Sequence, residues 1–102
     1  MKRSPIRRRS ARKAASDTAY AAWRLRYLDG ALCERCHQAQ ATEVHHRRLR
    51  SAGGHLTLPA NAARLCASCH REVHANPTDA HAAGWIVRAG DPEWDDLARE
   101  TR

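Results

Sequence analysis

The sequence has no phenylalanine, and its 102 residues include only three tryptophans and two tyrosines. Hydrophobic residues make up 42% of the chain, but many of these are alanines, and leucine, isoleucine and valine are sparse. Side chains this small give a single domain only a thin core. A domain of this size usually needs disulfides or a bound metal as additional support.

Long apolar segments are also absent, so the sequence predicts no transmembrane helix. The charged start, MKRSPIRRRSARK, is not followed by the apolar stretch of a signal peptide. We therefore expect a cytoplasmic protein with neither a membrane partner nor a small-molecule substrate. Thiols stay reduced in the cytoplasm, so paired cysteines there favour zinc over disulfides.

Acidic residues are missing from residues 1–16, which contain seven lysines and arginines. The remaining residues hold eleven basic and eleven acidic side chains, so the whole net charge of +7 lies in this segment. Such a run is typical of a disordered basic tail that binds a polyanion. We expect it to contact DNA phosphates through Arg7, Arg8 and Arg9; the alternative is a tail that only increases solubility.

The rest of the chain reads as a small α+β domain over residues 17–90, followed by a C-terminal helix over 91–102. A helix is predicted over 17–28, where Tyr20, Trp23 and Tyr27 form one stripe that favours core packing. A second helix is predicted over 66–76. Short strands are expected at 42–46, 56–58 and 85–87.

The four cysteines form two Cys-x2-Cys pairs about 30 residues apart, a spacing typical of tetrahedral zinc. We predict that they bind one structural Zn²⁺ and that folding depends on it. The four ligands are Cys33, Cys36, Cys66 and Cys69.

Four histidines remain close to these pairs. His70 and His74 share one face of the predicted helix, which suits metal chelation. His45 and His46 are adjacent on a predicted strand, so their side chains diverge. The spacing therefore favours one of these two as a third metal ligand and the other as a neutral general base. We expect the three other histidines, His37, His55 and His81, to have no special role.

The order of these residues resembles the zinc-bound subgroup of the HNH endonuclease family, also called ββα-metal nucleases. The resemblance rests on Glu43-Val44-His45-His46, then Asn61, then Leu65-Cys66-x2-Cys69-His70 and His74. The chain is also similar to small HNH proteins of phages and prophages that are associated with the DNA-packaging terminase. This implies a small α+β fold with a ββα-metal core, stapled by a four-cysteine zinc site and carrying flanking helices.

The resemblance assigns roles residue by residue. His45, His70 and His74 would bind a catalytic divalent metal such as Mg²⁺, Mn²⁺, Zn²⁺, Ni²⁺ or Co²⁺. His46 would be the general base, and Asn61 would fix the loop and orient His46 through hydrogen bonds. The implied reaction is hydrolysis of DNA phosphodiesters to 5′-phosphate and 3′-hydroxyl ends, in the bacterial host cytoplasm if the protein is phage-encoded.

Three arginines follow the histidine pair and are candidate phosphate contacts, because guanidinium suits that anion. They are Arg47, Arg48 and Arg50; the alternative is a solvated loop. No recognition helix is evident, so we expect low sequence specificity. Two other functions stay open: a non-catalytic zinc-ribbon module that binds DNA, and an accessory protein that acts on terminase subunits by contact alone.

Overall fold

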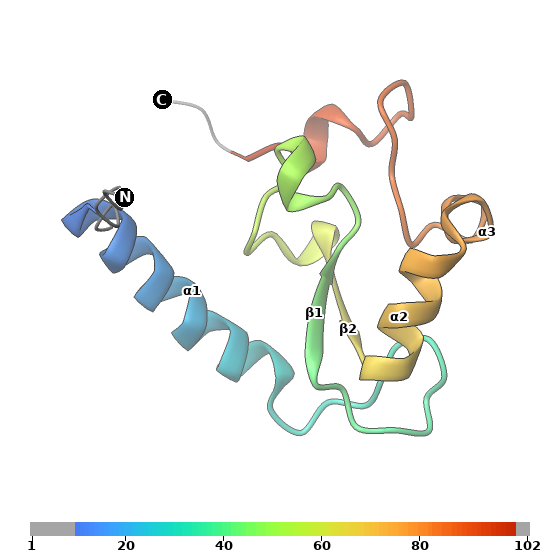
Figure 1. Cartoon of the computed structure of the whole chain (residues 1–102), viewed down its shortest axis with the longest axis horizontal. Coiled ribbons are helices and arrows are strands. Elements are labelled where there is room, and N and C mark those ends of the chain that lie inside the picture. The colour runs from blue at the N-terminus through green and yellow to red at the C-terminus, as the bar shows by residue number, and fades with distance from the viewer. Residues whose placement is uncertain (1–9, 100–102) are drawn as a thin grey trace, which may run out of the picture.

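The computed structural model describes residues 10–99, and it has the small α+β architecture that the sequence predicts (Figure 1). The elements are α1 (Ala11–Leu28), β1 (Glu43–His46), β2 (Ala62–Leu65), α2 (Ala67–Ala75) and α3 (Pro77–Ala82). Short 3-10 turns occur at Arg50–Ala52, Pro59–Asn61 and Asp95–Leu97. No helix within residues 10–99 is long and apolar enough to cross a membrane.

The two strands form an antiparallel pair in which His45 lies opposite Ala63 and Glu43 opposite Leu65. The prediction of a strand at 56–58 was wrong. The Nδ1 atom of His55 accepts hydrogen bonds from the backbone N–H groups of Thr57 and Leu58, at 3.2 and 3.1 Å. These bonds bend the backbone into a turn, and the second strand begins only at Ala62.

Helix α2 agrees with its prediction to within one residue at each end. Cys66 caps it, because its sulfur accepts a hydrogen bond from the backbone of Cys69. The helix packs its buried Val73 into a cluster with Leu65, Ala63 and Ala80, and three of the cysteines complete this core. Since the buried apolar residues are few and small, the cysteine cluster makes up a large part of the centre of the domain.

The four cysteine sulfurs lie within 4.8 Å of one another and are not joined as disulfides. The Sγ atoms of Cys36 and Cys66 are 4.0 Å apart, close to the edge of about 3.8 Å of a tetrahedron with Zn–S bonds of about 2.3 Å. This cluster could bind zinc.

Charge on this cluster supports the same conclusion. Burial raises the pKa of Cys33, but backbone N–H groups, first that of Cys36, outweigh it and lower the value to about 6. Burial raises the pKa of Cys69 to about 12. The protein alone therefore disfavours a thiolate at Cys69, and a cation bound by the cluster would favour its deprotonation.

Helix α1 begins at Ala11, six residues earlier than predicted, because the side chain of Ser10 caps it by accepting the N–H of Lys13. Residues 11–16 are thus helical, whereas the sequence suggested a disordered tail; residues 1–9 lie outside the described part of the chain. Figure 1 shows α1 extending away from the two strands. No α1 side chain is fully buried.

The aromatic stripe attaches the C-terminal half of α1 to the sheet. Trp23 stacks on Tyr27 with ring centroids 4.6 Å apart, and Tyr20 stacks on Trp23 at 5.9 Å. The Tyr27 hydroxyl donates to the carbonyl of Ala62, and Arg64 lies over the Tyr27 ring. The stripe packs onto the domain as expected, although its rings are half-buried rather than enclosed.

The prediction of a helix over 91–102 was wrong for the residues that the structure describes. The Asp91 carboxylate accepts a hydrogen bond from the backbone N–H of Arg88 and pairs with His81, both at 2.8 Å, so it does not cap a helix. Only one 3-10 turn forms, and Ala98 then bridges to Gly54 in an extended conformation. Segment 85–87 is not a strand either: Val87 makes a single backbone bond to Arg47.

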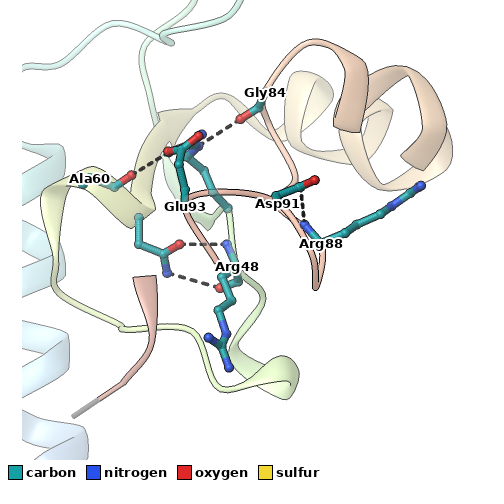
Figure 2. Close-up of polar contacts among 8 residues, drawn as sticks. Arg48, Ala60, Gly84, Arg88, Asp91 and Glu93 are labelled. Carbon is teal, nitrogen blue, oxygen red and sulfur yellow. Dashed lines mark hydrogen bonds and ion pairs between the residues drawn. The ribbon is translucent and has the colours of Figure 1, made fainter. Parts of the chain in front are cut away.

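An ion pair ties this C-terminal segment to the domain. Arg47 donates to both carboxylate oxygens of Glu93, at 2.7 and 3.0 Å, and to the carbonyls of Gly84 and Ala60. Figure 2 shows the Glu93 carboxylate beside these two carbonyl groups. The Arg47 side chain is only 20% exposed, and its contacts join three segments that are far apart in the sequence.

Removal of the cysteine-bound metal is expected to unfold the domain. Apparent zinc-binding energies of about 10–16 kcal/mol match or exceed the total stability of about 5–15 kcal/mol typical of small proteins. We predict that Cys69→Ser, or excess chelator, abolishes cooperative thermal unfolding measured by circular dichroism. His74→Ala serves as the control and should keep one tightly bound metal per chain and its unfolding transition. A cooperative transition in metal-free Cys69→Ser protein would contradict this dependence.

Glu93→Gln should lower the melting temperature at pH 7, with the effect disappearing in acid. The hydrogen bonds from Arg47 lower the pKa of Glu93 below its usual value near 4.5. A carboxylate whose pKa is lower in the folded state than in the unfolded state stabilises the fold at pH values above its unfolded-state pKa. This stabilisation is lost as the pH falls through its folded-state pKa. Thermal unfolding of both proteins from pH 3 to 7 tests this, with Asp96→Asn as a control for the lost charge. An equal effect of both substitutions would show that the pairing with Arg47 is unimportant.

Candidate metal and catalytic centre

His45 is the most buried polar side chain near the sheet apart from Asn61, with 1% of its surface exposed. Its Nε2 atom lies 2.5 Å from the carbonyl oxygen of Trp85. A carbonyl can only accept, so Nε2 carries the proton and Nδ1 presents a lone pair. That Nδ1 atom is buried without a hydrogen-bond partner. A buried acceptor left in this state is costly, which indicates that it binds something the protein itself does not supply.

His70 and His74, one turn apart on α2, face this atom. The ring of His45 lies 5.3 Å from that of His70 and 5.4 Å from that of His74, measured between centroids. Their ligand atoms all lie within 4.8 Å of one another. The two Nε2 atoms on α2 are 3.1 Å apart, near the edge of about 3.3 Å of a tetrahedron with Zn–N bonds of about 2.05 Å.

A carboxylate orients one of these ligands. Glu43 Oε1 lies 2.9 Å from Nδ1 of His70, so that Nδ1 donates its proton and Nε2 keeps its lone pair for a metal. Trp85 does the same for His45 through its carbonyl. Hydrogen bonds of this kind fix the tautomer and ring orientation of metal-binding histidines.

The electrostatics also suit a cation. Burial lowers the pKa of His45 to about 4, with further lowering by His70 and His74, so its imidazole is neutral. Burial and the neighbouring His70 lower the pKa of His74 as well. Three histidines with one orphaned acceptor thus form a site that fits a divalent metal, and nitrogen ligands favour Zn, Ni or Co among the candidates.

His46 follows His45 on β1, so its side chain leaves the opposite side of the strand. Its Nε2 donates to the carbonyl of Leu56 at 2.9 Å, which leaves the lone pair on Nδ1. Burial lowers the pKa of His46, assisted by the charge of Arg50, despite the opposing bond to Leu56. The imidazole is therefore neutral at pH 7, as a proton acceptor must be.

Comparison with known families relates the segment that carries this centre to one family. A family model described as HNH endonuclease matches residues 33–76, from the first cysteine to the C-cap residue of α2. This segment is an HNH domain. No curated protein and no solved structure matches the chain. The α+β architecture and the cysteine cluster accordingly form the ββα-metal fold, whose two strands and helix are β1, β2 and α2.

Asn61 is fully buried in the HNH domain, and the hydrogen bonds of its side chain go to residues other than His46. Its Oδ1 accepts the backbone N–H of Arg48 at 2.7 Å, and its Nδ2 donates to the carbonyls of His55 and Arg48 at 2.8 and 3.2 Å. It closes the loop between the strands and places Leu56, whose carbonyl holds His46. These hydrogen bonds suit the loop-fixing role expected of Asn61. Asn61 can orient His46 only indirectly, through the position of Leu56.

The three arginines after the histidine pair differ in their contacts. Arg47 is engaged by Glu93, and Arg48 donates to the carbonyls of Ala52 and Trp94 and lies 3.8 Å from the centre of the Trp94 ring. Arg50 is exposed, and its charge acts on two rings near the site: it adds to the burial that lowers the pKa of His46, and it opposes the burial that raises the pKa of Tyr20. Of the three, Arg50 is thus the best placed to meet a phosphate. Arg7, Arg8 and Arg9 lie outside the described residues.

Sequence reasoning gave no role to Glu43, nor to the carbonyls of Trp85 and Leu56. Glu43 had a usable signal: it precedes His45 by two residues on the same strand, so both side chains leave the same face. The carbonyls had none, because any residue provides one and only the fold brings segment 85–87 to His45.

The contact between Glu43 and His70 predicts that Glu43→Ala weakens the histidine metal site about 10- to 100-fold, the usual effect of losing such a partner. Glu43→Gln should lose less, because its amide oxygen can still accept the His70 proton. Isothermal calorimetry of Co²⁺ binding to the zinc-loaded protein measures the affinity of the histidine site without any assay of catalysis. Metal at the cysteine site should stay at one per chain, and equal affinities of Glu43→Ala and the unaltered protein would exclude this role.

Proposed function

We propose that the protein is a metal-dependent DNA endonuclease of low sequence specificity that hydrolyses phosphodiester bonds to 5′-phosphate and 3′-hydroxyl ends. The observation that supports the proposal most directly is that two adjacent histidines lie in different environments on opposite sides of one strand. His45 presents a buried, unpaired Nδ1 toward His70 and His74. His46 presents a neutral base on the other side of the same strand.

In this mechanism, Nδ1 of His46 accepts a proton from the attacking water, and the carbonyl of Leu56 stabilises the imidazolium through the proton on Nε2. His45, His70 and His74 would hold the divalent metal, and Glu43 keeps His70 aligned. A metal bound there would stabilise negative charge on the scissile phosphate and the leaving 3′ oxygen. Asn61 acts as a positioning residue, because it holds the loop that carries Leu56.

The charge distribution supports DNA as the substrate. The net charge of +7 is concentrated in residues 1–16, and the described part of that segment places Arg12 and Lys13 on the exposed end of α1. Such charges neutralise phosphates without reading bases, which is the basis for proposing low specificity. A setting in phage DNA processing, with terminase subunits as partners, rests on the sequence resemblance alone.

Replacing His46 tests the proposed chemistry. His46→Gln keeps a donor for the Leu56 carbonyl but has no basic nitrogen, so we expect cleavage of supercoiled plasmid to fall about 10²- to 10⁴-fold, the usual contribution of a general base. The assay would compare Mg²⁺, Mn²⁺, Zn²⁺, Ni²⁺ and Co²⁺ by gel electrophoresis.

His37→Asn is the matched control: His37 is exposed and has a positive φ of 55°, which asparagine tolerates. Its cleavage rate should equal that of the unaltered protein. Equal rates for His46→Gln would remove His46 from the mechanism. Binding of DNA without cleavage under any metal would favour the non-catalytic DNA-binding module instead.

A further inference from the structure

A groove of about 340 Å³ lies between α1 and the turn that follows Gly54. One wall is formed by Ser16, Ala19 and Tyr20 of α1, and the other by the turn at 55–57. Arg99 completes the lining. None of these lining residues carries a carboxylate, and Arg99 brings a positive charge to the groove.

The groove instead offers hydrogen-bond donors. Nδ1 of His55 accepts the backbone N–H groups of Thr57 and Leu58, so it holds the lone pair and Nε2 carries the proton. His55 can thus donate a hydrogen bond from Nε2. The hydroxyls of Ser16 and Thr57 and the guanidinium of Arg99 add further donors. Groups of this kind suit a phosphate oxygen.

The extended C-terminal segment holds Arg99 in place. Ala98 bridges to Gly54, and the backbone N–H of Arg99 donates to the carbonyl of Gly53 at 2.8 Å. The guanidinium also lies 3.4 Å from the carbonyl of Arg50. A side chain at position 54 would come within 1.7 Å of the Arg48 carbonyl oxygen, so the close approach of the backbone at residues 48 and 54 requires glycine at the position to which Ala98 bridges.

This groove adjoins the candidate catalytic base. Leu56, which lines the groove, supplies the carbonyl that holds His46. The ring of Tyr20, also in the lining, lies 6.1 Å from that of His46 between centroids. A chain of phosphates passing through the groove would therefore run next to the site where hydrolysis is proposed.

We propose that this groove binds the sugar-phosphate backbone of the DNA strand next to the scissile phosphate, with Arg99 and Nε2 of His55 as phosphate contacts. The proposal rests on the proposed nuclease function for its substrate. It gives His55 a direct role in binding and gives the C-terminal segment a role in placing a cation beside the active site.

The test measures binding rather than cleavage. Zinc-loaded protein carrying His46→Gln, which prevents turnover, would be titrated onto a fluorescent DNA duplex and a matching single strand, with anisotropy recorded from 50 to 200 mM salt. Arg99→Ala should weaken binding about tenfold, as expected for a lost charge-assisted contact. It should also reduce the slope of log K against log salt by about 0.9 on duplex or about 0.7 on single-stranded DNA.

His55→Asn and Arg88→Ala complete the design. In His55→Asn, the amide oxygen replaces Nδ1 as acceptor for the turn but no donor replaces Nε2, so binding should also weaken. Arg88 is exposed and is not among the residues that line the groove. Arg88→Ala therefore removes an equal charge and should leave the affinity within about twofold and the slope unchanged.

If Arg99→Ala and Arg88→Ala behave alike, or if His55→Asn binds as the parent does, the groove is not a phosphate site. This result is separate from the plasmid assay. If the unaltered protein cleaves no plasmid but Arg99→Ala still reduces the salt dependence of DNA binding, the groove is supported and the nuclease proposal fails. Plasmid cleavage with no difference between the two arginine variants would support the nuclease and reject the groove.

Discussion

The geometry of this protein depends on the meeting of four cysteine side chains, whose sulfurs lie close enough together to bind one cation. The thin core cannot fix the end of α2 by packing alone, because its buried side chains are mostly alanine, cysteine and a few aliphatic residues. Cys66 and Cys69 lie at the start of α2, immediately after β2, and Cys33 and Cys36 lie in the turn before β1. One metal there would hold the helix against the strand pair, and that same placement points His70 and His74 at His45.

The strand alternation then separates two adjacent histidines into different chemical environments. His45 points inward opposite Ala63, whose small side chain leaves room for a buried imidazole. His46 points outward toward Tyr20 and the loop. Each ring has its proton placed by a backbone carbonyl, from Trp85 in one case and Leu56 in the other. Neither carbonyl belongs to the histidine motif, so the surrounding chain determines which nitrogen of each histidine is reactive.

This division explains which features the sequence could predict. The cysteine pairs, β1 and α2 follow from local spacing and capping, and the predicted metal-ligand residues meet in space. Segments 56–58 and 91–97 have local signals for a strand and a helix, but tertiary or side-chain contacts prevail over these signals. His55 takes the backbone N–H groups that a strand would pair, and Asp91 binds His81 and Arg88 rather than capping a helix. A single sequence contains no information on such competing partners.

The same competition divides the arginines into two groups. Arg47 and Arg48 are surrounded by carbonyls, a carboxylate and an indole ring, so their charges stabilise the junction between the HNH domain and the residues after it. A phosphate could recruit them only by breaking these contacts. Arg50 and Arg99 are exposed, and the Arg99 guanidinium makes only a long contact, at 3.4 Å, with the Arg50 carbonyl. Arg99 is beside Arg50 because the C-terminal segment is extended and bridged to Gly54. The pairing of Arg47 with Glu93 helps to anchor that segment. Arg47 therefore helps to position Arg99.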